Sequence, residues 1–376
     1  MAVVYEAFDR VRGTAIALKC LSVERFSPGK QYDRAVALFE REYYALSQLT
    51  HPHIIEVYDY GLDSEGPYYS MELLTGTSLR AASPTRWDEA CSLVRDIASA
   101  LALLHSCSLV HRDVTPLNVH CDLHSRAKLI DFGAMMPAGV ARHLVGTPAF
   151  IAPESLRQQS LDGRADLFAL GACLYFAITG QRAFPAHSLD DLNDAWRVPP
   201  APPSQFAADV PEELDELILA LLSVERDDRP RTAAEVYERL TTLARLPREE
   251  AAGVAQAYLS RPALVGRSEQ LELLRERAQA SREGAGCSLL VRGVRGVGRS
   301  CMLDAAALEA TLAGFQVARA DNSAGDASSL GAVRQLLSVL VSSNPVLSRA
   351  LQATALSALT HEGLSDALDA SSKERA

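Results

Sequence analysis

Hydrophobic and polar positions along the first part of the chain follow two different periods. Short runs of apolar and β-branched side chains, each of strand length, occur at residues 3–8, 14–21, 54–61 and 67–74. The first two runs flank the turn-like residues 9–13, so they predict a β-hairpin. Residues 33–49 instead place apolar side chains at helical spacing, which predicts a helix between the two pairs of strands.

Helical periodicity dominates after Gly76. Apolar side chains recur at helical spacing in four segments, at residues 86–106, 163–180, 211–222 and 232–244. A tight stretch that contains His and Pro, residues 110–124, interrupts them. Because strands are followed by helices, we expect an α+β fold with two lobes, a small lobe at residues 1–74 and a helical lobe at 75–245.

A second unit is expected beyond the helical lobe. Residues 246–262 have the modest helical character of a linker, and a new pattern begins at Leu264. In residues 263–376 the expected elements are a helix from Ser268, a strand at 287–292, a helix after Ser300 and a strand at 315–320. Two strands cannot form a buried parallel sheet, so this unit is expected to be an incomplete α/β module.

Composition and charge narrow the class of protein. Of the 376 residues, 48% are hydrophobic and 22% are charged, the balance of a soluble globular protein. The net charge of −10 and the pI near 5.4 argue against nucleic acid as the main partner.

Cysteine use and hydropathy favour a cytoplasmic protein. The seven cysteines are scattered and form no Cys-x-x-Cys pair, as expected for reduced thiols. No signal-peptide pattern precedes the first motif. The longest nearly uncharged run, Leu167–Gly180, is shorter than the roughly 20 residues that cross a bilayer, so we expect a buried helix and no membrane insertion.

Short motifs occur in a fixed order along the two lobes. Ala17-Leu18-Lys19 ends the second predicted strand, and His111-Arg112-Asp113 lies in the tight stretch with Asn118 five residues after the aspartate. Asp131-Phe132-Gly133 follows 18 residues after Asp113, and Ala152-Pro153-Glu154 comes next. One triplet carries little information, but the ordered set has a very low chance of arising at random.

With these motifs, roughly residues 1–245 resemble the protein kinase family. The stretches GTPAFIAPE (146–154), GRADLFALGACLYFAITG (163–180) and RDDRP (226–230) are similar to those of the bacterial Ser/Thr branch. The resemblance implies a two-lobed protein-kinase fold that transfers the γ-phosphate of ATP to hydroxyls of protein substrates, with Mg²⁺ as the metal cofactor.

The residue types suit this chemistry, because phosphoryl transfer depends on positioning and charge neutralisation more than on covalent chemistry. A cation must hold the α/β-phosphates, which suits Lys19, and a carboxylate on the following helix must orient that cation. The resemblance favours Glu42 for this role over its neighbour Glu40. Asp113 is expected to orient the substrate hydroxyl and accept its proton.

The resemblance also implies the remaining contacts to nucleotide and metal. Asn118 and Asp131 would supply hard oxygen ligands for Mg²⁺. Around the adenine we expect a hinge that runs from Glu72 to Leu74 and a gatekeeper at Met71. Val4 and Ala17 would lie on either side of the base.

Other polar residues of the two lobes are given structural roles. Asp166 and Arg112 are interpreted as groups that hold the catalytic loop, and Glu154 with Arg229 resembles an ion pair inside the helical lobe. His51 and His53 suggest either a metal pair or a capped turn between helix and strand, and we favour the turn.

The sequence departs from the family pattern at its start and in the catalytic loop. No Gly-x-Gly-x-x-Gly precedes Val4, for which we favour a start codon assigned too late, or a fragment, over real loss. Thr115 stands where Ser/Thr kinases carry a lysine that contacts the transferred phosphate. A hydroxyl cannot supply that charge, so transfer would lose electrostatic stabilisation.

The segment after the Asp-Phe-Gly motif contains no residue that could be phosphorylated. Between Asp131 and Gly146 there is no Ser, Thr or Tyr, and Thr147 is the first hydroxyl. A phosphate paired with Arg112, the usual switch of such loops, therefore has no acceptor there. We hypothesise that control comes from elsewhere in the chain, including a regulatory contact with the C-terminal module.

The C-terminal unit carries a second nucleotide-site pattern. Residues 293–300, GVRGVGRS, have the spacing of a phosphate-binding loop with Gly293 and Gly298, Arg299 in place of lysine, and Ser300 placed to bind Mg²⁺. Arginine lacks the compact ammonium group, which puts hydrolysis in doubt. With LVGRSEQLELL (264–274), the segment resembles the start of an AAA- or STAND-type ATPase module; a plain glycine-rich turn is the alternative.

Three hypotheses follow. The leading one is a Ser/Thr protein kinase. The second is a pseudokinase scaffold that binds nucleotide or partners without transfer, which the intact set of Lys19, Asp113, Asn118 and Asp131 opposes. The third, a regulator whose main activity is that of the second nucleotide site, is weak because that site is the more degraded one.

Overall fold

The computed structural model describes residues 2–22, 30–63, 66–247 and 267–312, without residues 142, 187, 283, 295 and 296, together with residues 315, 317, 318, 320 and 336. Most of the expected linker and part of the strand expected at 315–320 lie outside these described residues.

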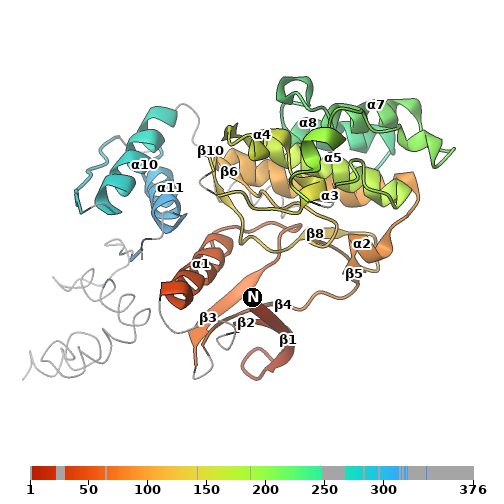
Figure 1. Cartoon of the computed structure of the whole chain (residues 1–376). Helices are drawn as coiled ribbons and strands as arrows, with labels where there is room; N and C mark the ends of the chain where they lie inside the picture. Colours follow the sequence, from red (N-terminus) through yellow and green to blue (C-terminus); the bar gives the residue numbers. More distant parts are fainter. Residues whose placement is uncertain are drawn as a thin grey trace, which may run out of the picture. The chain divides into compact units, whose positions relative to one another are not determined.

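A four-stranded antiparallel sheet forms the small lobe (Figure 1). In sheet order its strands are β1 (Ala2–Asp9), β2 (Thr14–Leu21), β4 (Pro67–Glu72) and β3 (Val57–Leu62). Helix α1 (Lys30–Leu46) packs on the sheet, where Leu21, Phe39 and Tyr69 are buried together. The predicted hairpin, helix and second strand pair are confirmed, with ends that differ by a few residues.

The pairing of β2 with β4 decides which side chains share a face of the sheet. Lys19 lies opposite Tyr69, and Ala17 lies opposite Met71. Because side chains alternate along a strand and paired residues project to the same side, these four residues belong to one face. Val4 on β1 lies opposite Lys19 and joins that face.

Helices and short strands make up the helical lobe. Its α-helices are α2 (Leu79–Ala82), α3 (Trp87–Ser106), α4 (Pro153–Leu156), α5 (Gly163–Thr179), α6 (Leu192–Ala195), α7 (Glu212–Leu221) and α8 (Ala233–Leu243). Its strands are β5 (Thr77–Ser78), β6 (Leu109–Val110), β7 (Val119–Cys121), β8 (Ala127–Leu129), β9 (Met136–Pro137), β10 (Gly139–Val140) and β11 (Ser160–Leu161). Single 3₁₀ turns lie at Pro148–Phe150, Pro203–Gln205 and Arg226–Asp228. The four predicted helices correspond to α3, α5, α7 and α8 and are confirmed.

Helix α5 is buried along most of its length. The Asp162 side chain caps its N-terminus by accepting a hydrogen bond from the backbone N–H of Arg164. Gly180 ends the helix at a φ of 68°, a left-handed conformation that favours glycine. The uncharged run Leu167–Gly180 is therefore a core helix, as predicted. None of the helices in the described parts of the chain combines the length and the apolar character that crossing a bilayer requires.

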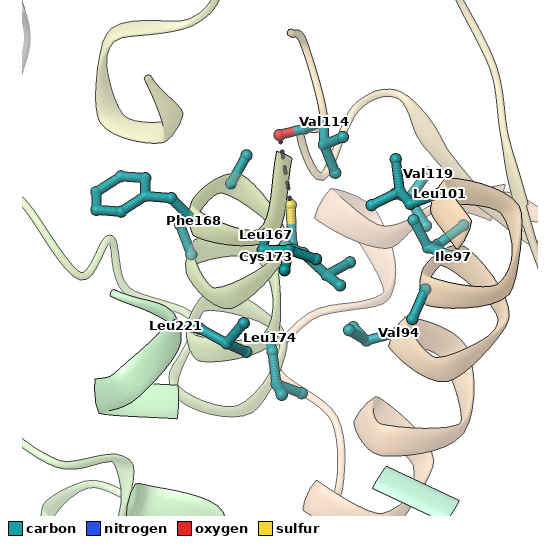
Figure 2. Close-up of a cluster of buried hydrophobic side chains, with 14 of the residues drawn as sticks. Val94, Ile97, Leu101, Val114, Val119, Leu167, Phe168, Cys173, Leu174 and Leu221 are labelled. Atoms are coloured by element: carbon teal, nitrogen blue, oxygen red, sulfur yellow. Dashed lines mark hydrogen bonds between the residues drawn. The ribbon is translucent and has the colours of Figure 1, made fainter. Parts of the chain in front are cut away.

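The core of α5 also fixes the His-Arg-Asp stretch. Figure 2 shows side chains of α3 and α5 meeting in one apolar cluster that includes Ile97 and Leu174. In this cluster the Cys173 Sγ donates to the carbonyl oxygen of Val114 at 3.7 Å. Because Val114 directly follows Asp113, this contact ties the position of that aspartate to the core.

Asp166 of α5 holds the same stretch through its backbone. Its carboxylate is fully buried and accepts hydrogen bonds from the backbone N–H of His111 and of Arg112, both at 2.8 Å, and from the His105 ring at 2.9 Å. Burial by itself would raise the pKa of Asp166, but these hydrogen bonds and the charge of His105 hold that pKa below its ordinary value. The structural role predicted for Asp166 is confirmed by these contacts.

A second buried ion pair lies in the helical lobe. Arg229 Nη1 and Nη2 donate to the two carboxylate oxygens of Glu154, at 2.7 and 2.9 Å. Both residues are at most 3% exposed, and the Arg229 guanidinium also donates to the carbonyl oxygen of Arg164. The ion pair predicted from the sequence is therefore present, and it joins the start of α4 to α5.

The region expected to form a C-terminal unit contains two described helices, α10 (Ser268–Arg282) and α11 (Arg299–Leu312), and both helices were predicted. An ion pair of 2.7 Å between Arg275 and Glu309 joins them. The strand expected at 287–292 is wrong, because these residues form no strand and Leu290 is 74% exposed. A strand needs a hydrogen-bonded neighbour, and the described residues of this unit provide none.

The contact between α5 and α7 gives a test of core packing. A Cβ on Gly171 would lie 2.5 Å from the Cβ of Leu221. Alanine is favoured over glycine in an exposed helix by about 1 kcal/mol, but overpacking a core costs about 1–3 kcal/mol. We expect Gly171→Ala to lower the free energy of unfolding by about 1 kcal/mol in urea denaturation. The control is Gly286→Ala, because a Cβ at Gly286 would meet nothing within 4 Å. A Gly171→Ala protein as stable as the wild type would contradict the predicted clash with Leu221.

The Asp166 network predicts a pH dependence of stability. Because the folded-state pKa is depressed, the Asp166 charge stabilises the fold above its ordinary pKa of 3.8, and this contribution is lost as the pH falls through the folded value. We expect Asp166→Asn to cost about 3 kcal/mol of unfolding free energy at neutral pH. In urea titrations at a series of pH values, the difference from the wild type should shrink below the ordinary pKa. A difference that does not change with pH contradicts the assignment.

Candidate active site

Lys19 lies between two carboxylates at the edge of the small lobe. Its Nζ is 2.7 Å from Oε1 of Glu42 on α1 and 3.9 Å from Oδ1 of Asp131. The Glu42 side chain is 7% exposed, whereas that of Asp131 is 52% exposed. The ammonium group therefore connects a buried carboxylate to an accessible one.

Glu42, and not Glu40, contacts the lysine. Glu40 accepts a hydrogen bond from the phenol of Tyr60 at 3.0 Å, and burial raises the pKa of Glu40. The Glu42 Oε1 that contacts Lys19 also accepts from the backbone N–H of Phe132 at 3.4 Å. One carboxylate oxygen thus receives donors from both lobes.

Sequence reasoning missed Tyr69 as a member of this group. Its phenol donates to the same Oε1 of Glu42 at 3.2 Å. The sequence carries no separate motif for it, because its closeness to Lys19 depends on the register between β2 and β4, which a hydrophobic pattern alone does not specify.

Asp131 begins a turn with an uncommon backbone conformation. Its φ of 63° lies in the left-handed region, which residues other than glycine seldom adopt. Its Oδ1 accepts from the backbone N–H of Gly133 at 3.2 Å, while Phe132 is buried edge-on against His111 with ring centroids 4.7 Å apart. The turn therefore buries the phenylalanine and leaves the Asp131 carboxylate accessible.

Asn118 and Thr147 converge on the carboxylate of Asp113. Asn118 Nδ2 donates to Oδ2 at 2.9 Å, and Thr147 Oγ1 donates to Oδ1 at 3.4 Å. The backbone N–H of Asp113 donates to Nδ1 of His111 at 3.3 Å, and burial lowers the pKa of His111, which favours the neutral ring that can accept it. A carboxylate that already contacts a hydroxyl in this way suits a general base.

Thr115 lies in the turn beneath this group. It is 3% exposed, and its Oγ1 accepts from the backbone N–H of Asn118 at 3.4 Å. Its hydroxyl thus shapes the turn that presents Asn118 and brings no positive charge to Asp113.

Two arginines contact the backbone of the segment that follows the Asp-Phe-Gly motif. Arg112, at a φ of 71°, donates to the carbonyl oxygens of Ala134 and His143, and Arg41 of α1 donates to that of Met135 at 2.6 Å. Burial, followed by the neighbouring Arg41 charge, lowers the pKa of Arg112. The segment is therefore held through carbonyl oxygens by two cations.

The structure brings the expected adenine residues only partly together. These residues are Val4, Ala17, Met71, Glu72 and Leu74. Ala17 is buried opposite Met71, and Val4 shares their face but is 53% exposed. Glu72 pairs with Lys128, and Leu74 packs against the core of the helical lobe.

The accessible oxygens of the site fit a hard divalent cation. Asp131 offers a carboxylate, and Asn118, whose amide N–H groups donate to Asp113, keeps its amide oxygen as a ligand atom. No group of three or more His, Cys, Asp or Glu side chains forms a metal site among the residues described here. Such a donor set suits Mg²⁺, which completes its shell with phosphate oxygens and water.

The histidines of the loop before β3 form a turn, as favoured from the sequence. The His51 Nδ1 accepts from the backbone N–H of His53 at 3.1 Å, and the His53 ring hydrogen-bonds the carbonyl oxygen of Ala127 at 2.9 Å. Burial lowers the pKa of His51 to about 3, so this ring is neutral. Both rings are thus engaged in the fold.

The second nucleotide pattern lies at the start of α11. Gly298 has a φ of 88°, and Arg299 and Ser300 are the first residues of the helix. A cavity of about 290 Å³ next to them is lined by Leu273, Leu289, Met302 and other side chains of this unit. Gly293 is also described, whereas residues 295 and 296 of the same loop lie outside the described residues.

Comparison with known proteins shows what this chain is similar to. A family model described as a protein kinase domain matches residues 1–239. The chain is 34% identical over 248 residues to the DNA damage-responsive serine/threonine-protein kinase RqkA of Deinococcus radiodurans, covering 62% of this chain and 36% of that protein. It is 34% identical over 215 residues to the serine/threonine-protein kinase PknB of Mycolicibacterium smegmatis, covering 53% and 34%.

The chain thus spans about a third of the length of these relatives. The matched region contains Lys19 with its partners Glu42 and Asp131, and the hydrogen-bonded pair of Asp113 and Asn118. The chain belongs to the protein kinase family.

Proposed function

We propose that the two lobes act as an ATP- and Mg²⁺-dependent Ser/Thr protein kinase on protein substrates. The observation that carries the proposal is the pair of contacts of Lys19, 2.7 Å to buried Glu42 and 3.9 Å to accessible Asp131. This arrangement supports a cation oriented toward triphosphate and an accessible carboxylate that can bind metal. The Ser/Thr kinases among the relatives support the same substrate class.

In the proposed mechanism each side chain has a separate task. Lys19, oriented by Glu42, binds the α/β-phosphates, and Asp131 and Asn118 hold Mg²⁺. Bound Mg²⁺ would neutralise charge on the phosphates. Asp113 orients the substrate hydroxyl and accepts its proton while the hydroxyl oxygen forms a bond to the γ-phosphorus and the bond to ADP breaks.

The expected adenine contacts belong to the same proposal. Val4 and Ala17 would enclose the base, Met71 would limit the depth of its pocket, and Glu72 and Leu74 would provide the hinge. The buried position of Ala17 opposite Met71 supports this part.

Thr115 favours a second candidate function, a scaffold that binds nucleotide without transferring phosphate. Its buried hydroxyl leaves the Asp113 site without the cation that stabilises the transferred phosphate. The contacts of Lys19, Asp113 and Asn118 support the kinase instead.

The C-terminal unit enters the proposal as a partial AAA- or STAND-type ATPase-like module. The start of α11 at Arg299 and the cavity beside it support phosphate binding by Gly293, Gly298, Arg299 and Ser300. A regulatory contact of this module with the kinase lobes and a cytoplasmic location remain predictions from the sequence.

The role of Asp113 gives the first activity test. Asp113→Asn keeps the hydrogen-bonding shape but removes the base, so kcat for a Ser/Thr peptide should fall about 100-fold or more. The affinity for MgATP should change by less than about twofold, since Asp113 does not contact the phosphates in this mechanism. Labelled-ATP transfer and calorimetry measure the two quantities.

The matched control is Asp194→Asn, an aspartate 77% exposed on α6. This variant should turn over like the wild type. Equal turnover by the wild type, Asp113→Asn and Asp194→Asn would support the scaffold and contradict the kinase.

The contacts of Arg112 and Arg41 predict activity without a phosphate on the segment. The guanidinium groups of Arg112 and Arg41 already donate hydrogen bonds to carbonyl oxygens of Ala134, Met135 and His143, so they do not need a phosphate as partner. We therefore expect phosphatase-treated protein to keep its kcat within about twofold. Intact-mass measurement confirms dephosphorylation. A tenfold loss that accompanies removal of phosphate from Thr147 is the result that would contradict this.

A further inference from the structure

Tyr69 touches both members of the Lys19–Glu42 pair. Its hydroxyl is 3.2 Å from Oε1 of Glu42, and Nζ of Lys19 lies 5.6 Å from the centroid of its ring. The register of β2 and β4 places Tyr69 directly opposite Lys19. Both side chains therefore leave the sheet toward α1.

The phenol is committed to Glu42 as a donor. Tyr69 is 1% exposed, and burial, together with the charge of Glu42, raises the pKa of its hydroxyl. The group thus stays protonated at any working pH. A buried carboxylate needs donors to replace water, and Oε1 of Glu42 has two side-chain donors, Lys19 at 2.7 Å and Tyr69 at 3.2 Å.

Helix α1 fixes the ring of Tyr69. The ring centroid of Phe39 lies 5.0 Å away and that of Tyr43 lies 5.7 Å away, both from α1. The hydroxyl can therefore reach Glu42 only while α1 is packed on the sheet. The strand and the helix locate the carboxylate from two directions.

We propose that Tyr69 is a positioning residue that holds Glu42 in contact with Lys19. The inference rests on the proposed phosphotransfer role of that pair. Its alternative is an aromatic residue that only fills the core. Phenylalanine has the same ring without the hydroxyl, so Tyr69→Phe separates the two.

The test compares Tyr69→Phe with Tyr43→Phe in the full chain. Without the phenol, Lys19 is the remaining side-chain partner of Glu42 among the residues that the structure describes, so kcat/KM for ATP should fall about tenfold, a loss of about 1.4 kcal/mol. KM for the peptide substrate should stay within about twofold of the wild type. Tyr43→Phe removes a hydroxyl that donates to the carbonyl oxygen of Tyr58 at 3.0 Å in the same aromatic layer, and it should leave kcat/KM unchanged.

A double-mutant cycle distinguishes positioning from packing. In a Glu42→Gln background, Tyr69→Phe should lower kcat/KM by less than about twofold further, because the carboxylate it holds is gone. An undiminished tenfold loss in that background overturns the proposal, as does a Tyr69→Phe single variant with wild-type kcat/KM.

Calorimetry with MgADP separates this proposal from the proposed function. Tyr69→Phe should weaken MgADP binding about fivefold, and Tyr43→Phe should not. If the wild type transfers no phosphate but Tyr69→Phe still binds MgADP more weakly than the wild type and Tyr43→Phe, the kinase proposal fails and the role of Tyr69 stands. If the wild type transfers phosphate and Tyr69→Phe changes neither turnover nor MgADP affinity, the role of Tyr69 fails alone.

Discussion

The buried carboxylate of Glu42 is the group on which the geometry of the site depends. A charge withdrawn from water is tolerated only where donors replace the water. Glu42 receives them from Lys19 on β2, from Tyr69 on β4 and from the backbone of Phe132. The sheet, α1 and the Asp-Phe-Gly turn must all be in place before the Glu42 carboxylate has its three hydrogen-bond donors. A fully hydrogen-bonded Glu42 therefore requires all three elements to be packed together.

Helix α5 provides the second fixed reference. Its Asp166 accepts two backbone N–H groups of the His-Arg-Asp stretch, and its Cys173 reaches the residue after Asp113. Asp113 thus stands on a loop, while a buried helix sets the position of that loop. This division explains why Asp113 can remain partly accessible without losing its orientation.

The segment after the Asp-Phe-Gly turn has no Ser, Thr or Tyr before Thr147, and it is held by contacts that need no phosphate. Arginine side chains donate strong hydrogen bonds to phosphate, but they can also donate to backbone carbonyl oxygens. Arg112 and Arg41 use carbonyl oxygens of Ala134, Met135 and His143. The contacts are individually weaker than those to a phosphate, and they are present in the unmodified chain.

Local patterns determined much of this protein. The helices α3, α5, α7 and α8 and the hairpin of β1 and β2 could be predicted because each depends on neighbouring residues. The candidate residues Lys19, Asp113, Asn118 and Asp131 could be singled out because each lies in a short motif of adjacent residues. The sequence already favoured Glu42 over Glu40, and the contact of Glu42 with Lys19 agrees with that choice. Tertiary structure alone decided the approach of Tyr69 to that carboxylate and the failure of residues 287–292 to form a strand. The physical reason is that strand register, burial of charge and strand pairing each depend on a partner far away in sequence, and a pattern along one segment does not contain its partner.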